Sequence, residues 1–202
     1  ICNCAEFYRG RNAVMAGKFS NMADRIANSF RACFWQAEGQ YLYDCVTEDF
    51  KDASIRPNQI FAVSLPFSPL DSQQQKAVVS CVENNLLTPV GLRTLAATDS
   101  KYRGRYEGGP GERDSAYHQG TVWPWLIGHF IEAYLKINNH SKQSKKICAD
   151  RLEPLLEHLR NDGCIGNISE IFDGDEPRKP RGAFAQAWSV AEVLRAYLLI
   201  HS

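Results

Sequence analysis

The sequence predicts an all-α protein that is built from layered helical hairpins. Across the 202 residues, apolar side chains recur at helical spacing in almost every segment. Segments that are apolar nearly all round alternate with segments that carry a single apolar stripe, which is typical of inner helices packed inside an outer layer. Strands and helices do not alternate, so the pattern does not indicate a parallel-sheet enzyme. We expect residues 1–202 to form a single domain.

The first part of the chain contains one long predicted helix and one short one. Residues 12–35 repeat apolar side chains along one stripe, which predicts an amphipathic helix. A short β-ribbon is expected around residues 41–44. Residues 58–65 are predicted to form a helix, because Pro57 has the fixed φ that suits a first helical turn.

A third helix and a long loop follow. Ser72 and Gln75 have the spacing of a capping box, so we expect a helix to begin there. Residues 87–120 are rich in glycine and predict a long loop that is either mobile or a lid over the substrate.

The last part of the chain contains three predicted helices. Residues 122–137 are apolar nearly all round and are expected to be buried on most sides. Residues 142–160 carry one apolar stripe, and Pro154 is expected to kink this helix or to mark its true start. Residues 182–200 place apolar side chains on one face and predict the last helix.

The composition excludes several classes of protein. A hydrophobic content of 44% excludes a disordered polymer, and the chain is long enough to bury a sizeable core. The 23 basic and 23 acidic residues leave no net charge, so there is no electrostatic case for a nucleic-acid partner. We find no run that could cross a membrane, and no motif that indicates a metal or another cofactor.

The seven cysteines are scattered along the chain and odd in number. Most of them stand among apolar residues, as buried free thiols do. We therefore expect a reduced protein in the cytoplasm, without a framework of disulfides.

Glu170 is the strongest candidate for a catalytic group. It lies in an acid-rich loop beside Ile171 and Phe172, and a carboxylate in such an apolar niche suits a general base. The Trp, Tyr, His, Arg and Gln side chains elsewhere suit a sugar, which offers hydroxyls to polar groups and C–H faces to aromatic rings. The alternative is that Glu170 only caps a turn or bonds a neighbouring backbone group.

Five stretches of sequence form a recognisable series. They are ASIRPNQIFA (53–62), LTPVGLRTL (87–95), YHQGTVWPW (117–125), ISEIFDG (168–174) and AQAWSV (185–190). In this order and spacing they resemble the amylo-α-1,6-glucosidase family, the C-terminal catalytic domain of glycogen debranching enzymes. The resemblance extends over most of the chain.

The resemblance implies an (α/α)6 toroid, in which inner helices are enclosed by outer helices and the active site lies at the mouth of the inner ring. It also implies hydrolysis of single glucose residues that are attached through α-1,6 branches, with inversion at the anomeric carbon. Glycogen or a branched maltooligosaccharide would be the substrate. Glu170 would be the general base, which activates water on the face of the sugar opposite the general acid.

The general acid of the family has no counterpart in this chain. The family carries it as the aspartate of a Thr-Trp-Met-Asp-Ala type motif, and only Met22-Ala23-Asp24 comes near, within a regular amphipathic helix. Because the chain begins at Ile1 and would supply only about half of the toroid's helices, we expect an inactive C-terminal fragment that carries the base and lacks the acid. The uncovered helix flanks predict self-association or aggregation.

Ten further residues are candidates for substrate binding, either as polar groups for sugar hydroxyls or as rings for a sugar face. They are Arg56, Asn58, Gln59, Arg93, His118, Gln119, Trp123, Asp173, Gln186 and Trp188. Gln186 is expected to open the last helix.

Several of these candidates have structural alternatives. Arg56, Asn58 and Gln59 either contact glucose or pair with Asp52 and satisfy loop carbonyls. His118 either faces the pocket or caps a helix.

The remaining alternatives concern the tryptophans and two charged residues. Trp123 and Trp188 either stack on a sugar or belong to the core. Arg93 and Asp173 either orient Glu170 or bind sugar hydroxyls. Two other functions stay open: a non-catalytic carbohydrate-binding piece, and another inverting glucosidase on the same toroid, glucoamylase-like or trehalase-like.

Overall fold

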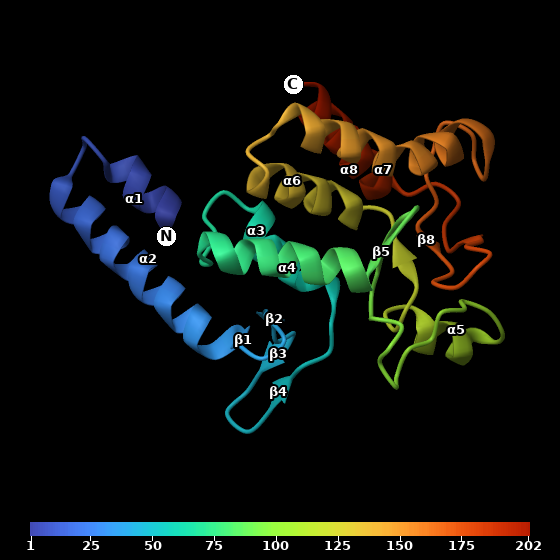
Figure 1. Ribbon diagram of the computed structural model, residues 1–202, viewed down its shortest axis with the longest axis horizontal. Helices are drawn as coiled ribbons and strands as arrows, with labels where there is room; N and C mark the ends of the chain where they lie inside the picture. The colour runs from blue at the N-terminus through green and yellow to red at the C-terminus, as the bar shows by residue number, and fades with distance from the viewer.

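The computed structural model of the chain describes residues 1–202 and is mainly helical, as Figure 1 shows. None of its helices combines the length and the apolar character that a membrane span requires. The helices are α1 (Cys2–Tyr8), α2 (Ala13–Phe34), α3 (Phe61–Ser64), α4 (Ser72–Asn85), α5 (Pro110–Ala116), α6 (Leu126–Ile137), α7 (Lys142–Asn161) and α8 (Ala187–His201), with the 3-10 helix η1 (Pro57–Ile60) directly before α3.

Short strands complete the fold, and none is longer than three residues. They are β1 (Trp35–Gln36), β2 (Tyr41–Leu42), β3 (Cys45–Val46), β4 (Lys51–Asp52), β5 (Leu87–Thr88), β6 (Gly91–Arg93), β7 (Val122–Trp123), β8 (Ile171–Phe172) and β9 (Pro180–Arg181). The pairs β1–β2 and β3–β4 form antiparallel ribbons, so the ribbon expected near residues 41–44 is confirmed. Strands β5 to β9 form a five-stranded antiparallel sheet in sequence order. Because these strands are so short, the predicted all-α class is confirmed.

The five-stranded sheet was not predicted, and it corrects the boundaries of two helices. Residues 122–123 pair in β7, so α6 begins at Leu126 rather than at residue 122. The chain leaves β9 through Gly182, whose φ of +68° is foreign to a helix, so α8 begins at Ala187 rather than at residue 182. Strands of two residues show no alternation of apolar and polar side chains, which is why the pattern missed them.

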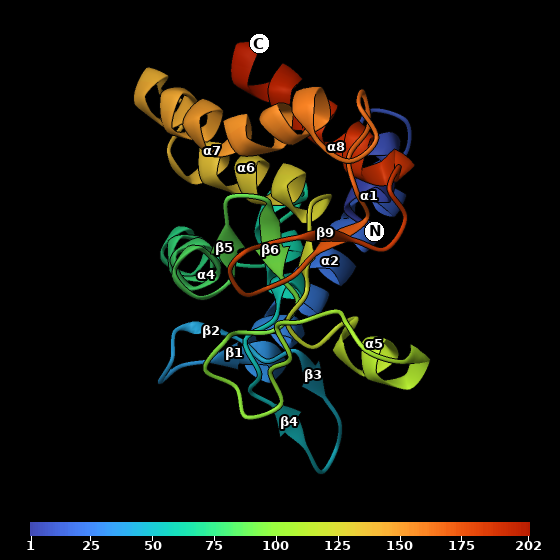
Figure 2. The ribbon, with the colours of Figure 1, turned by 90° about the vertical axis from the view of Figure 1, so that its right-hand side faces the viewer.

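Helix α6 forms the centre of the core. It packs against α3, α4, α7 and α8, and its side chains Phe130, Ile131 and Leu135 are fully buried. Each such side chain contributes about 1.5–3 kcal/mol through the area it removes from water. Helix α7 buries a single stripe that includes Cys148 and Leu152. The predicted contrast between a buried and an amphipathic helix is therefore confirmed, and Figure 2 shows α6, α7 and α8 gathered above the sheet.

One local prediction is corrected, and one of two alternatives is excluded. The capping box of α4 is formed one residue earlier than expected: the Asp71 carboxylate accepts from the Gln74 N–H at 2.8 Å, and the Gln74 side chain accepts from the Asp71 N–H at 3.2 Å. Ser72 and Gln75 already lie inside the helix. Pro154 lies inside α7 and does not mark its start.

Two predicted segments are subdivided. Residues 87–120 are not one loop, because they contain β5, β6 and α5. The helix expected over residues 58–65 consists of η1 followed by α3, with Pro57 in the first turn as predicted.

Helices α1 and α2 form a hairpin that extends beside the other elements in Figure 1. The Asn12 side chain caps α2 by accepting from the Met15 N–H at 3.0 Å. No residue of α2 is buried, although Phe30 and Phe34 stack with ring centroids 4.9 Å apart and touch the core. The predicted apolar stripe is formed, but most of it is not covered.

The cysteines are all free thiols. Only Cys148 is buried, and burial raises the pKa of its thiol to about 11. Cys4, Cys33 and Cys45 are exposed, so the expectation that most of the cysteines are buried is wrong. Apolar neighbours in the sequence of a helix lie on other faces, and therefore do not bury the residue between them.

Candidate active site

Glu170 lies where the chain enters β8, and its carboxylate meets three hydrogen-bond donors. Its Oε1 accepts from the Tyr117 hydroxyl at 2.7 Å and from the Gln186 side-chain amide at 3.3 Å. Its Oε2 accepts from the Ala183 N–H at 2.9 Å. The residue is half-buried, so the carboxylate is held in one orientation without being sealed from solvent.

These donors come from separate parts of the chain. Tyr117 follows α5, Ala183 follows β9, and Gln186 is the N-cap of α8, as predicted for the start of the last helix. The alternative in which Glu170 only bonds a nearby backbone group accounts for the Ala183 contact alone. The convergence of a phenol and an amide on the same oxygen is typical of a functional carboxylate.

Tyr117 is a site residue that the sequence predictions missed. Burial, followed by the hydrogen bond to Glu170, raises the pKa of the Tyr117 phenol well above its usual range. The hydroxyl therefore stays protonated at neutral pH and donates. Tyr117 opens the YHQGTVWPW stretch, but a tyrosine there is equally suited to core packing, so nothing in the pattern selects it as a site residue.

The backbone passes very close to Glu170 at Gly182. This glycine has a φ of +68°, and a Cβ on it would lie 2.2 Å from Glu170 Oε2. Glycine is required both for the left-handed backbone and for the close approach.

An aromatic cluster lies beside Tyr117. His118 stacks on Trp123, with centroids 5.1 Å apart, and Trp188 stacks on Trp125 at 5.4 Å. Trp123 is 5% exposed and its indole N–H donates to the Tyr117 carbonyl at 3.1 Å, so it belongs to the core. Trp188 is 46% exposed and keeps ring surface free for a sugar. The core alternative therefore holds for Trp123, and stacking of Trp188 on a sugar stays a prediction.

His118 does not cap a helix. It lies between α5 and β7, whereas the N-cap of α6 is Trp125, which makes no side-chain cap bond. Partial desolvation, followed by the nearby Arg56 guanidinium, lowers the pKa of His118. The imidazole is therefore neutral at neutral pH and offers one donor and one acceptor, a combination that suits a sugar hydroxyl.

Arg56 joins the entrance of η1 to the turn that carries His118. Its guanidinium donates to the His118 carbonyl and to Gln119 Oε1, each at 2.8 Å. Its acidic partner is Asp44, with Nε 3.6 Å from Oδ2, and not Asp52, the partner named in the structural alternative. Asp52 instead accepts from the Ser54 N–H at 2.9 Å. Arg56 and Gln119 therefore hold two site segments together.

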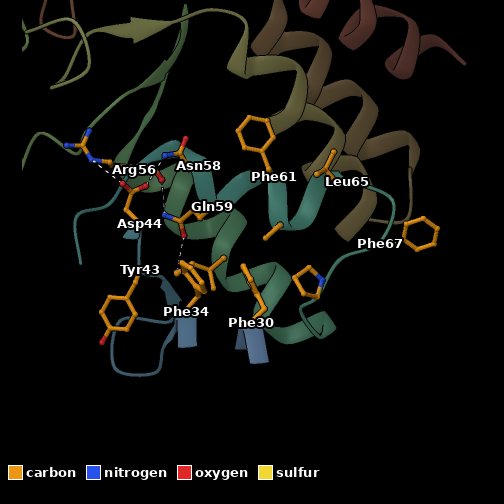
Figure 3. A pocket seen from close by; sticks show the side chains of 13 residues that line it. Phe30, Phe34, Tyr43, Asp44, Arg56, Asn58, Gln59, Phe61, Leu65 and Phe67 are labelled. Atoms are coloured by element: carbon orange, nitrogen blue, oxygen red, sulfur yellow. Dashed lines mark hydrogen bonds and ion pairs between the residues drawn. The ribbon is translucent and has the colours of Figure 1, made fainter. Parts of the chain in front are cut away.

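A pocket of about 280 Å³ opens beside Arg56, and Figure 3 shows its lining. At its polar rim, Asn58 Nδ2 donates to Asp44 Oδ1 at 2.9 Å. Apolar side chains, among them Phe30 and Phe61, line the rest. A second hollow of about 220 Å³, lined largely by polar groups, shares Asp44, Arg56 and Asn58 with the first. Asp44 was not predicted, because its role depends on partners that are distant in sequence.

Gln59 has a supporting role. It is 6% exposed, its Nε2 donates to the Arg56 carbonyl at 3.1 Å, and its Oε1 accepts from the Leu42 N–H at 3.4 Å. Gln59 lines the pocket, but its amide bonds backbone groups through both its oxygen and its nitrogen, which favours the alternative in which it satisfies loop groups.

Arg93 and Asp173 make no direct contact with Glu170. Arg93 Nε donates to the Gly174 carbonyl at 3.2 Å. Asp173 is 0% exposed and accepts from Arg181 Nη2 at 2.9 Å. A fully buried carboxylate cannot reach a sugar hydroxyl, so the predicted binding role of Asp173 is corrected to a structural one.

His158 anchors the residue that precedes Glu170. The Ser169 N–H donates to His158 Nε2 at 3.3 Å, and His158 Nδ1 lies 3.3 Å from Asp162 Oδ2. The C-terminal part of α7 therefore supports the loop that carries the candidate base.

The family to which the chain belongs is shown by a match to a family model. The family model described as amylo-alpha-1,6-glucosidase matches residues 6–195. The chain belongs to this family. One relative is the glycogen debranching enzyme of Saccharomyces cerevisiae, with 34% identity over 93 residues. That match covers 42% of this chain and only 6% of the yeast protein.

A solved structure shows where the fold belongs. The neutral trehalase of Saccharomyces cerevisiae is similar with a TM-score of 0.64 and 13% identity, over 91% of this chain and 31% of the trehalase chain. The fold of this chain is therefore that of part of an (α/α)6 toroid, as predicted.

Glu170 is a half-buried carboxylate whose orientation is fixed by neutral donors. No second acidic side chain is bonded to it or to its donors, and Asp24, in the only sequence near the acid motif, is exposed on α2. No group of three or more His, Cys, Asp or Glu side chains is placed to hold a metal ion. The arrangement suits acceptance of a proton from water at Glu170.

Proposed function

We propose that this chain carries the general base of a glycosidase that removes α-1,6-linked glucose from glycogen-like glucans. The main support is the geometry of Glu170, a half-buried carboxylate that a phenol, an amide and a backbone N–H fix in orientation. The family match and the printed name of the yeast relative, glycogen debranching enzyme, support the substrate class.

The two oxygens of Glu170 have different roles in this proposal. Oε1 accepts from both Tyr117 and Gln186, whereas Oε2 accepts only from Ala183. Since each carboxylate oxygen has two acceptor sites, Oε2 keeps one for a water molecule. That water gives its proton to Oε2 while its oxygen attacks the anomeric carbon.

The proposed reaction inverts the anomeric centre. As the water oxygen bonds to the anomeric carbon, the glycosidic C–O bond breaks, and the leaving oxygen takes a proton from a general acid on the opposite face. The carboxyl groups of such pairs stand about 6.5–9.5 Å apart. The acid is the part of the mechanism that we assign to residues outside this chain, and the isolated chain is accordingly proposed to be inactive.

Sugar binding is assigned to polar and aromatic groups that are at least partly open to solvent. Trp188 offers ring surface, and His118 offers a neutral imidazole. Arg56 and Asn58, with their partner Asp44, form the polar rim of the pocket in Figure 3. Gln119 and Gln186 hold Arg56 and Glu170, and each keeps amide atoms available for a hydroxyl.

The remaining proposals concern the setting of the chain. Residues 1–202 are assigned to one catalytic domain in the cytoplasm, with glycogen or a branched maltooligosaccharide as the ligand. Exposed apolar side chains on α2 and α8, including Val14, Ile26, Leu194 and Leu198, favour self-association of the isolated chain. Light scattering tests this; a monodisperse monomer would contradict it.

Glu170→Gln in the full-length protein tests the function. Glucose release from a branched dextrin should fall by about 10²–10⁴ in kcat, because a positioned base contributes that much. Glu157→Gln, on the exposed face of α7, is the matched control and should retain activity. A Glu170→Gln enzyme within about tenfold of wild type would contradict the role.

Substrate choice separates the other functions. Release of glucose from α-1,4 or α,α-1,1 substrates in preference to α-1,6 branches would favour a glucoamylase-like or trehalase-like enzyme. Saturable binding of a maltooligosaccharide in calorimetry, without turnover by the full-length protein, would favour a binding module.

A further inference from the structure

The Asp173 carboxylate is fully buried at the end of β8, and Arg181 is its main partner. Arg181 Nε lies 3.2 Å from Oδ1 and 3.1 Å from Oδ2, and Nη2 donates to Oδ2 at 2.9 Å. The Tyr106 N–H donates to Oδ1 at 2.9 Å, and Arg105 Nη1 lies 4.0 Å from Oδ2. A buried charge persists only where it is paired and hydrogen-bonded, so this contact fixes the position of Arg181.

Arg181 directly precedes the backbone that holds Glu170. The next residue, Gly182, approaches the carboxylate so closely that a Cβ would lie 2.2 Å from Oε2. Ala183 then donates its N–H to Oε2 at 2.9 Å, and its carbonyl accepts from the Glu170 N–H at 2.8 Å. The β8–β9 ladder has only two residue pairs, which by themselves restrain this segment weakly.

We propose that Asp173 and Arg181 are positioning residues for Glu170, an inference that rests on the proposed general-base role. Their ion pair fixes the backbone of residues 181–183, and that backbone fixes the Glu170 carboxylate. Neither residue contacts substrate. A shift of this segment carries Oε2 away from the water that it activates, so chemistry is impaired while substrate binding is not.

Two conservative variants test the ion pair in the full-length protein. Arg181→Lys keeps the charge but cannot engage both carboxylate oxygens, and Asp173→Asn keeps the shape but not the charge. Each should lower kcat by about 10- to 100-fold, since a misplacement of 1 Å can cost 10²-fold. KM should stay within about threefold of wild type, because uniform substrate binding is retained. Folded variants with wild-type kcat would overturn the proposal.

A double-mutant cycle separates positioning from a general structural role. If Asp173 and Arg181 act through Glu170, their substitution in a Glu170→Gln background should cause no further loss of kcat. An additive loss would overturn the positioning role and leave the general-base role intact. An active Glu170→Gln enzyme would remove both roles, so the two failures are distinguishable.

A glycine pair tests the same backbone without disturbing the buried ion pair. Gly182 and Gly166 both have left-handed φ, +68° and +83°, but a Cβ on Gly166 would have nothing within 4 Å. Alanine therefore strains both positions, and only Gly182→Ala also displaces Glu170. We expect kcat to fall by about tenfold or more in Gly182→Ala and to stay near wild type in Gly166→Ala. Equal kcat values for the two variants would overturn the proposal.

Discussion

Glu170 and Asp173 stand on either side of β8, yet their surroundings are opposite. Glu170 is half-buried, and its partners are a phenol, an amide and a backbone N–H. Asp173 is 0% exposed, and its main partner is the Arg181 guanidinium. The Glu170 carboxylate is held by neutral donors and stays open to solvent. The Asp173 carboxylate is sealed against a guanidinium and serves as an anchor.

The difference in burial and in partners indicates that the two ends of strand β8 have different roles. The open side carries Glu170 and the sealed side carries Asp173. A similar contrast in burial separates two tryptophans in contact, the exposed Trp188 of α8 and the buried Trp123 of β7. Changes on the open side should therefore affect activity, and changes on the sealed side should affect stability first.

The largest effect on stability should come from Arg181→Met. This change leaves the Asp173 carboxylate buried without its bidentate partner, so the free energy of unfolding should fall by about 3–5 kcal/mol. Urea denaturation measures the loss. Arg160→Met is the control, because the Arg160–Glu153 pair lies on the surface and should matter little. An Arg181→Met protein as stable as wild type would show that the sealed side is not an anchor.

Removal of the Tyr117 hydroxyl should have the next largest effect, this time on kcat. Tyr117→Phe loses the donor to Glu170 Oε1, and a hydrogen bond to a charged group contributes about 1.5–3 kcal/mol, so kcat should fall by about 10- to 100-fold. Steady-state glucose release measures it. The control is Tyr106→Phe, since the Tyr106 ring packs 5.7 Å from that of Tyr117 while its hydroxyl bonds nothing in the structure. Equal kcat values for the two variants would contradict the assigned role of Tyr117.

A smaller loss of stability should appear at alkaline pH. The pKa of Tyr117 is raised in the folded state, so its contribution to stability is complete below the unfolded pKa of about 10 and is lost as pH rises through the folded value. Wild type should therefore lose more stability between about pH 9 and pH 11 than Tyr117→Phe does. Urea midpoints at the two pH values measure the difference, and identical losses would contradict it.

The smallest effect should come from Trp188→Ala. The Trp188 side chain is 46% exposed, so the free energy of unfolding should change little. The KM for a branched dextrin should rise by roughly 2- to 10-fold, because the contact between the ring and the sugar is lost. Trp123→Ala should show the reverse, a large loss of stability, because this side chain is 5% exposed. A lower stability of Trp188→Ala than of Trp123→Ala would contradict the distinction between the exposed and the buried tryptophan.

The sequence could predict the elements whose physical basis is local. The stripe of α2 and the buried character of α6 follow from spacing alone. Glu170 could be selected because a carboxylate in an apolar loop within a family stretch is unusual. The degree of burial could not be predicted in the same way. Both α2 and α6 carry apolar side chains at helical spacing, but only α6 has residues that are buried by the elements packed around it.

The unpredicted parts depend on contacts between distant residues. The hydrogen bond between Tyr117 and Glu170 joins residues that are 53 positions apart in the sequence, and the bond between Arg56 and Gln119 joins residues 63 positions apart. The choice of Asp44 over Asp52 as the partner of Arg56 depends on how the β3–β4 ribbon folds back. The need for glycine at position 182 appears only when the Glu170 carboxylate is placed beside it.

The anomeric form of the first glucose released tests the central claim most directly. The full-length protein would act on a branched dextrin while proton NMR follows the anomeric signals before mutarotation. If Glu170 activates water on the face opposite the leaving group, the α-linked substrate must yield β-glucose first. Initial release of α-glucose would contradict this, since it requires attack by an enzyme nucleophile in place of water.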